Sequence, residues 1–254
     1  MMERYDDLEG KVAVVTGGSR GIGAATARAL ALNGALVAVV GRDSEAIAAT
    51  VESIITKDGR AIGVAADCTR ESDIAELRHS VEDRLGPIDI LATFAGGNGM
   101  PVPTERETGE HWRSVLESDL TSTFLTISEF LPGMIERHTG AIVTMSSAAA
   151  RQAAKSSAAY AAAKAGVVAF TRHLGGEFAG DGIRVNCLAP SAVENDRMRA
   201  WMSSDERVAL GAAFPLGRIG QPDDVAAAAL FLASSASSWI TGVTIDIAGG
   251  KVMV

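Results

Sequence analysis

Short apolar runs rich in β-branched residues alternate along this chain with longer segments of helical composition. Runs of this kind are typical of strands buried on both faces of a parallel sheet, whereas helices need about ten residues or more. The alternation predicts an α/β fold, a single Rossmann-type domain spanning 1–254 with a doubly wound parallel sheet of about seven strands flanked by helices. The expected strands are 11–16, 35–40, 61–66, 88–93, 141–145, 183–188 and 241–247, and the expected helices are 24–32, 44–58, 72–85, 107–137, 157–176 and 223–233.

Three local details of this pattern can be tested directly. Ser44 is expected to cap the second helix, and Pro132 is expected to break the helical stretch 107–137. The segment 98–104 should be a loop. The segment 191–220 is polar and irregular, with a helical centre at 195–213, and it follows a strand end. Its length and position predict a mobile lid over a site.

Composition narrows the class of protein. The 254 residues, 47% of them hydrophobic, suffice for one large α/β domain, and no apolar run reaches membrane-spanning length. The net charge of −8 disfavours nucleic acid and anionic membranes as partners. Cys68 and Cys187 form no CxxC pair, and the first residues form no apolar leader, so we expect a cytoplasmic protein with reduced thiols. The four histidines are scattered, so we expect no metal site.

The glycine-rich turn after the first strand predicts a phosphate site. The sequence TGGSRGIG runs from Thr16 to Gly23, between a strand and a helix. Glycines allow the backbone to approach a diphosphate, and the helix N-terminus offers unpaired N–H groups. An ordinary tight turn is the alternative. The candidate cofactor-binding residues here are Gly17, Ser19, Arg20, Gly21, Ile22 and Gly23.

The residue after the second strand distinguishes the two nicotinamide dinucleotides. An acidic side chain at that point binds the ribose 2′-hydroxyl of NAD(H). This chain has Gly41 there, followed by Arg42 and Asp43. Gly41 leaves room for a 2′-phosphate, and Arg42 and Arg20 can pair with it, so we favour NADP(H) over NAD(H). In the alternative, both arginines face solvent and Asp43 takes the ribose.

Two further strand ends carry candidate binding residues. Asp67 follows the third strand, where its carboxylate either accepts the adenine amino group or caps the next helix. Ala95 and Gly96 follow the fourth strand, and such small residues allow the backbone to approach a ligand.

Candidate acid/base chemistry lies between Ser147 and Lys164. Ser147 follows the fifth strand, and Tyr160 comes 13 residues later. Lys164 lies four residues beyond Tyr160, so both side chains share one helical face. A free phenol has a pKa near 10, and a neighbouring ammonium favours the phenolate. The alternative is a surface pair with no chemical role.

These motifs together resemble the short-chain dehydrogenase/reductase family, in the branch of the 3-oxoacyl-carrier-protein reductases. The resemblance rests on TGGSRGIG, on the Ser147, Tyr160 and Lys164 set, and on the tail PLGRIGQPDDVAAAALFLASSASSWITG, and it spans about 8–250. It implies that Tyr160 is the acid/base, that Lys164 also holds the nicotinamide ribose, and that Ser147 orients the substrate oxygen. It further implies cofactor contacts from Gly17, Ser19, Arg20, Ile22, Asp67, Cys68 and the backbone of Val193.

The chain departs from the family pattern in places. Thr93-Phe94-Ala95-Gly96 replaces Asn-Asn-Ala-Gly, Ser191 replaces a glycine, and Asn195 replaces a threonine. Asp119 occupies the position of the fourth catalytic residue, an asparagine, 41 residues before Tyr160. A carboxylate there competes for the Lys164 ammonium, so we expect activity with an altered pH profile.

The predicted function is an NADP(H)-dependent oxidoreductase that interconverts a ketone or aldehyde with a secondary alcohol. The partner is a small-molecule substrate, and the acidic balance, with Asp181 expected near the site's mouth, disfavours an acyl carrier protein. The alternative is a catalytically impaired NADP(H)-binding regulatory or scaffold protein. The small-residue face Ala161, Ala165 and Ala169 predicts a homotetramer or homodimer.

Overall fold

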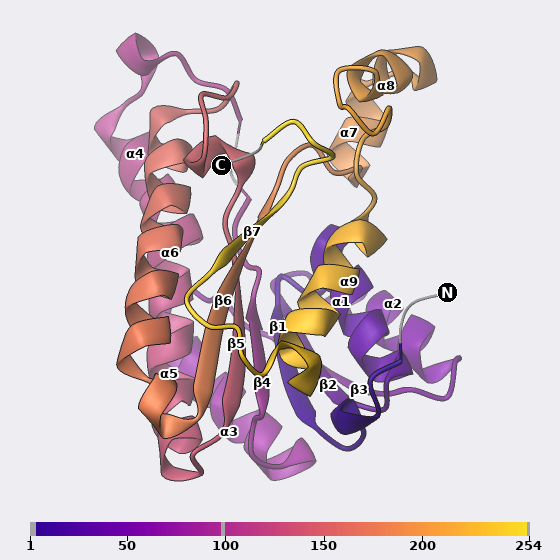
Figure 1. Ribbon diagram of the computed structural model, residues 1–254, viewed down its shortest axis with the longest axis vertical. Helices are drawn as coiled ribbons and strands as arrows, with labels where there is room; N and C mark the ends of the chain where they lie inside the picture. The colour runs from indigo at the N-terminus through magenta and orange to yellow at the C-terminus, as the bar shows by residue number, and fades with distance from the viewer. Residues whose placement is uncertain (1–3, 98–99, 253–254) are drawn as a thin grey trace.

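A seven-stranded parallel sheet forms the centre of the molecule, in the order β3-β2-β1-β4-β5-β6-β7 (Figure 1). The computed structural model describes residues 4–97 and 100–252, so the first two residues of the predicted loop 98–104 lie outside the described residues. The sheet confirms the predicted α/β fold. Its strands are β1 (Val12–Thr16), β2 (Leu36–Gly41), β3 (Arg60–Ala65), β4 (Ile90–Thr93), β5 (Gly140–Met145), β6 (Ile183–Pro190) and β7 (Thr244–Ile247).

Helices cover both faces of the sheet. On one face pack α1 (Gly21–Leu32), α2 (Ser44–Ile55) and α9 (Pro222–Ala233). On the other pack α3 (Glu71–Leu85), α5 (Ser122–Glu136) and α6 (Ala158–Glu177). The remaining helices are α4 (Gly109–Leu116), beside α6, and α7 (Asp196–Trp201) and α8 (Ser204–Gly211), which stand beyond the carboxyl ends of the strands.

The two-sided cover explains why the strands are almost continuously apolar. In β1, Ala13 and Val15 belong to the core under α1 and α9, whereas Val12 and Val14 belong to the core under α3 and α5. All four are buried. Successive side chains of a strand point to opposite faces, so a strand covered on both sides needs apolar residues at every position.

The expected helix break lies elsewhere than at Pro132. Helix α5 continues through Pro132, and the irregular part is a π-helical turn, Glu117–Thr121, that joins α4 to α5. Pro132 and Ser128 are both exposed, so the carbonyl that loses its N–H partner lies on the solvent side of the helix. In the π turn, the Ser122 hydroxyl donates to the Ser118 carbonyl at 2.7 Å and supports the wider backbone.

Two other local expectations were wrong. Asp43, not Ser44, caps α2, because its carboxylate accepts the Ala46 N–H. Asp181 lies in the turn before β6, at the amino edge of the sheet, so it is far from the carboxyl edge where an open parallel sheet binds ligands. The expected helical centre at 195–213 is present as α7 and α8, divided where Ser203 forms a capping box with Glu206.

The state of the cysteines and the length of the helices can be read directly from the structure. Cys68 and Cys187 are buried free thiols. Across residues 4–97 and 100–252, every helix is too short or too polar to cross a membrane.

Replacing Pro132 by alanine should stabilise the protein. The substitution restores a backbone donor inside α5, so we expect the free energy of unfolding to rise by about 1–3 kcal/mol. Urea unfolding followed by circular dichroism measures the change. Ser128→Ala, one turn earlier on the same exposed face, should stay within about 0.5 kcal/mol of the wild type. A less stable Pro132→Ala variant would show that the proline contributes to α5.

Candidate active site

The glycine turn between β1 and α1 is shaped by close backbone contacts. A Cβ atom at Gly23 would lie 2.1 Å from the Gly17 carbonyl oxygen, and one at Gly18 would lie 2.6 Å from that of Val15. Gly17 also has a positive φ of 63°. Arg20 begins α1 without a side-chain cap, so the first N–H groups of the helix remain available to a ligand. The turn therefore fits a diphosphate.

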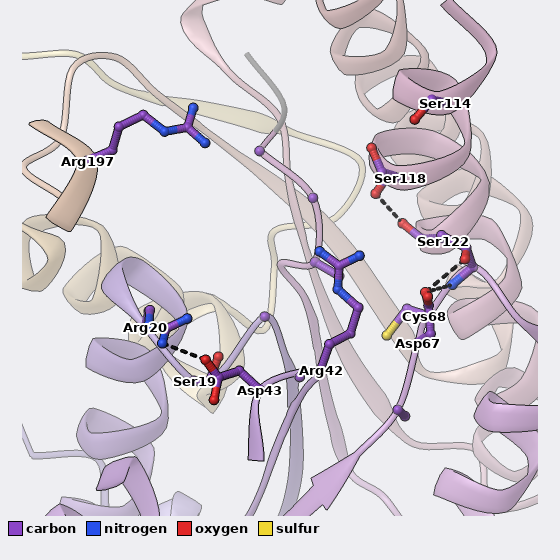
Figure 2. Close-up of a pocket in the computed structure, with 17 residues that line it drawn as sticks. Ser19, Arg20, Arg42, Asp43, Asp67, Cys68, Ser114, Ser118, Ser122 and Arg197 are labelled. Carbon is purple, nitrogen blue, oxygen red and sulfur yellow. Dashed lines mark hydrogen bonds and ion pairs between the residues drawn. The ribbon is translucent and has the colours of Figure 1, made fainter. Parts of the chain in front are cut away.

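A cavity of about 580 Å³ opens beside this turn (Figure 2), within the size range of small-molecule sites. It is lined from the ends of β1, β2, β3 and β4, from the helices that flank the π turn, and from α7. The predicted cofactor residues among its lining are Gly17, Ser19, Arg20, Arg42, Asp67, Cys68, Ala95 and Gly96.

Arg20 and Arg42 differ in what they contact. The Arg20 guanidinium pairs with the Asp43 carboxylate at 2.6 Å (Figure 2). The N–H of Ala46 and the Arg20 guanidinium together hold the pKa of Asp43 below its usual value. Arg42 forms no hydrogen bond or ion pair with any residue that the structure describes. Arg20 and Arg42 were both expected to pair with a 2′-phosphate. Because Asp43 already pairs with Arg20, Arg42 is the arginine that stays available for this contact.

Asp67 lies in the pocket wall and does not cap α3. One oxygen of its carboxylate accepts from the backbone N–H and the hydroxyl of Thr69, at 3.0 and 2.8 Å. These bonds, with Arg42 and Arg70 nearby, lower the pKa of Asp67. Helix α3 begins later, after Arg70, without a side-chain cap. Burial raises the pKa of the neighbouring Cys68 thiol to about 11, so the thiol in this wall of the pocket is protonated at neutral pH.

The backbone after β4 keeps its position without the asparagines of the family pattern. The Thr16 hydroxyl accepts the N–H groups of Phe94 and Ala95, at 3.0 and 3.2 Å. A Cβ at Gly96 would lie 2.6 Å from an Asp119 oxygen, so this residue must be glycine. Thr16 was not predicted as a site residue. A threonine at the end of a strand, immediately before the glycine turn, was the available signal.

Tyr160 and Lys164 lie near the carboxyl edge of the sheet, where Lys164 reaches the Met145 carbonyl at the end of β5, two residues before Ser147. Ser147 follows β5, and its hydroxyl oxygen accepts the Ala149 N–H at 3.2 Å, which leaves the hydroxyl hydrogen available to another oxygen. Tyr160 and Lys164 lie on α6 as predicted. The Lys164 Nζ is 5.7 Å from the centre of the Tyr160 ring. Ser147 and Tyr160 are half-buried, whereas Lys164 is only 3% exposed.

Asp119 and Lys164 form a buried ion pair, with 3.1 Å between the carboxylate and the ammonium. Lys164 also donates to the Met145 carbonyl, at 3.0 Å. Asp119 accepts the Gly97 N–H at 2.7 Å and the Ser118 hydroxyl at 2.8 Å. Burial opposes its charge, but Lys164 and these donors outweigh burial and hold the pKa of Asp119 below its usual value. Asp119 is therefore ionised at neutral pH.

Helix α6 is fixed at its N-terminus by two acceptors. Ser157 caps it by accepting the Tyr160 N–H at 3.1 Å. Glu107, whose side chain is buried, accepts the Ala159 N–H and pairs with His111 at 3.0 Å. No sequence pattern pointed to Glu107, because it lies more than fifty residues before Ala159, in a loop. These contacts fix the position of Tyr160 in the first turn of α6.

Val193, in the segment after β6, pairs with Gly220 in an isolated parallel bridge. The bridge closes the segment 191–220 at its base, and α7 and α8 lie within that segment. Ser191 donates its N–H to Ile247 in β7, and the Asn195 side chain caps α7. Of the apolar residues of this segment, Phe214 is buried against Gly249, whereas Trp201 and Val208 are exposed.

Comparison with known proteins identifies the class. A family model described as enoyl-(acyl carrier protein) reductase matches residues 17–251. With this sheet, glycine turn and Ser147, Tyr160 and Lys164 arrangement, the chain belongs to the short-chain dehydrogenase/reductase family. It is an NAD(P)-dependent oxidoreductase that acts on CH–OH or carbonyl groups.

The relatives span several named activities. The chain is 37% identical to the 3-oxoacyl-[acyl-carrier-protein] reductase FabG of Vibrio cholerae, over 98% of this chain and 100% of that protein. It is also 37% identical to the cis-4-hydroxycyclohexanecarboxylate dehydrogenase of Sinomonas cyclohexanicum, over 96% of this chain and 97% of that protein. A crystal structure of a putative gluconate dehydrogenase from Agrobacterium tumefaciens superposes with a TM-score of 0.92 at 33% identity, covering 99% of this chain and all of that one.

Gly23→Ala should weaken dinucleotide binding. The added methyl group would collide with the Gly17 carbonyl, so the turn must shift away from its present shape. We expect the Kd for the cofactor to rise at least about tenfold, a cost of about 1.4 kcal/mol. Fluorescence titration of the reduced dinucleotide measures it. Gly176→Ala, with open space around the new methyl group, is the matched control. Unchanged affinity in Gly23→Ala would contradict the phosphate role of the turn.

Proposed function

We propose that this protein is an NADP(H)-dependent oxidoreductase that interconverts a carbonyl and a secondary alcohol, with Tyr160 as the acid/base. The observation that carries the proposal is the buried Lys164 ammonium beside the Tyr160 ring, held by the Met145 carbonyl at the end of the strand that Ser147 follows. A half-buried phenol, a fixed positive charge and a hydroxyl donor are the groups that proton transfer to a carbonyl oxygen requires.

The preference for NADP(H) rests on the end of β2. Gly41 has no side chain to occupy the space of a 2′-phosphate, and the next residue is Arg42, which forms no hydrogen bond or ion pair within residues 4–97 and 100–252. Asp43, which could have bound a ribose hydroxyl, is engaged by Arg20 and by the N-terminus of α2. A guanidinium fits a phosphate in bidentate fashion, so Arg42 supplies the selectivity.

The remaining cofactor contacts are proposed from the pocket lining and from the family pattern, since part of the glycine turn, Lys164 and Val193 do not line the pocket. The turn with Gly17, Ser19, Gly21, Ile22 and Gly23 holds the diphosphate. Asp67 and Cys68 face the adenine, because they lie where β3 ends in the same pocket. Ala95 and Gly96 pass beneath the ligand, Lys164 holds the nicotinamide ribose, and the backbone of Val193 binds the carboxamide.

The proposed mechanism assigns one task to each side chain. When bound, the nicotinamide ring supplies or accepts the hydride. Ser147 donates its hydroxyl hydrogen to the substrate oxygen and orients the reacting carbon. Tyr160 gives its phenolic proton to that oxygen during reduction and takes it back during oxidation. Lys164 stabilises the phenolate by charge, and Asp119 positions Lys164 by holding its ammonium at 3.1 Å.

The substrate is a small-molecule ketone, aldehyde or secondary alcohol. The relatives' names mention a 3-oxoacyl-[acyl-carrier-protein], a cis-4-hydroxycyclohexanecarboxylate and, for a putative dehydrogenase, gluconate. What these compounds share is a carbonyl or hydroxyl group on carbon, which fits the groups around Ser147. The segment 191–220 is proposed as the lid over this site. An acyl carrier protein stays disfavoured by the net charge of −8. The position of Asp181 at the opposite edge removes the second reason given against it.

The predicted assembly is a homotetramer or homodimer. Ala165 and Ala169 are exposed on α6, and the neighbouring helices expose Phe124 and Trp112. Small residues on a helix face allow close packing against a second copy, and we propose this face as the contact. The cytoplasmic location stays a prediction.

The second candidate is an NADP(H)-binding regulatory or scaffold protein without turnover. The observation in its favour is that Lys164 is engaged by Asp119 and by the Met145 carbonyl. Tight binding of NADPH with no turnover on a panel of carbonyl compounds would support it.

Tyr160→Phe separates the two candidates. If Tyr160 is the acid/base, the variant should lose about 10²- to 10⁴-fold in kcat, since only the phenolic proton is removed. Its Kd for NADPH should stay within about threefold of the wild type, because the ring remains. Absorbance of the nicotinamide measures turnover, and fluorescence titration measures binding. Equal turnover in both proteins would contradict the assignment.

Asp119→Asn should move the pH–rate curve. The pKa of Asp119 lies below its usual value, so the wild type has a negative charge beside Lys164 across the assay range. A negative charge favours the protonated form of the neighbouring acid/base groups. Its removal should therefore make it easier for Tyr160 to lose its proton. The acidic limb for alcohol oxidation should therefore move to lower pH, as seen in initial rates between pH 5 and 10. Asp43→Asn, on an exposed pair in the cofactor pocket, is the control. An unmoved curve for Asp119→Asn would refute its role.

A further inference from the structure

Arg197 is the arginine of α7 that has no ion-pair partner among the described residues. It lines the large cavity together with the glycine turn, although it belongs to the segment after β6. It forms no hydrogen bond or ion pair with any residue in the described part of the chain. Figure 2 shows its side chain reaching from α7 toward the pocket.

The other arginines of the same segment are engaged. Arg199, on the same helix, pairs with Asp196 at 3.0 Å and with Glu194 at 3.8 Å. Arg207, on α8, lies 3.7 Å from Glu194 and donates to the Met202 carbonyl at 2.7 Å. Glu194 and Asp196 are thus engaged by these two arginines. In the described part of the chain, no acidic side chain pairs with Arg197, which lines the cavity.

The cavity that Arg197 lines has the features of an anion site. Gly17 and Ser19 line it, and the uncapped start of α1 adds a positive dipole end. Ser147 and Tyr160 do not line this cavity. The two acidic side chains in its wall are committed, Asp43 to Arg20 and Asp67 to Thr69. The guanidinium of Arg197 is therefore suited to pair with an anionic ligand in this cavity.

We propose that Arg197 binds the diphosphate of the bound dinucleotide, so that the cofactor itself fastens α7 over the pocket. The 2′-phosphate is the less suitable group, because Arg42 already stands at the end of β2. In Figure 2, Arg197 approaches from the side away from Asp67 and Cys68, where the adenine is expected. The inference rests on the proposed cofactor site, but not on which of the two dinucleotides is preferred.

Arg197→Gln tests the proposal by binding alone. The variant loses one charge-assisted contact, so the Kd for NADPH should rise about 10- to 100-fold. The Kd for NADH should rise by the same factor, because both dinucleotides contain the diphosphate. Arg199→Gln, on the same helix but turned to Glu194 and Asp196, should leave both values unchanged. Arg197→Lys should recover part of the affinity, and the effect of salt on Kd should be smaller in Arg197→Gln.

A second measurement reports on α7 directly. Hydrogen exchange of the α7 amides should slow when NADPH binds to the wild type and to Arg199→Gln, and should stay fast in Arg197→Gln at saturating NADPH.

Three results would overturn the proposal. A loss confined to NADPH would place Arg197 on the 2′-phosphate. An unchanged Kd with a raised KM for the carbonyl substrate would place it on the substrate. Equal exchange in all three proteins would show that the cofactor does not fasten α7. Failure of the wild type to bind either dinucleotide is a different outcome, which would refute the proposed cofactor site itself.

Discussion

The buried ion pair between Asp119 and Lys164 holds four parts of the molecule in one arrangement. Asp119 comes from the π turn between α4 and α5, and Lys164 comes from α6. The same two side chains reach the backbone of Gly97 after β4 and of Met145 at the end of β5. Two charges removed from water are stable only with such complete hydrogen bonding. The loop that borders the cofactor and the helix that bears Tyr160 are therefore fixed relative to each other.

This arrangement explains the irregular helix before it. A regular α-helix through Glu117–Thr121 would rotate the following residues by part of a turn, whereas the π turn accommodates the extra residue and leaves Asp119 fully buried. The glycine at position 96 has the same origin, because the Asp119 carboxylate occupies the space of a side chain there. The π turn and the glycine at position 96 are thus both associated with the burial of the Asp119 carboxylate.

The sequence predicted the sheet, because its strands are covered on both faces and apolar throughout. It predicted Tyr160 and Lys164, because a spacing of four residues fixes a shared face in any helix. It did not predict the engagement of Arg20 by Asp43, nor Glu107 at the start of α6, since each depends on residues brought together only by folding. The error at Pro132 has a related cause, since propensity takes no account of which side of a helix faces solvent.

The parallel sheet also gives the molecule two edges that differ in how well they tolerate changes in length or sequence. Every strand ends at the edge that bears the pocket, and the returning connections, such as the turn at Asp181 before β6, all lie at the other. Changes in length or sequence at those returning turns act on no group that contacts a ligand. They are the places where a reporter, a fusion partner or a surface attachment could be joined while the entrance stays open.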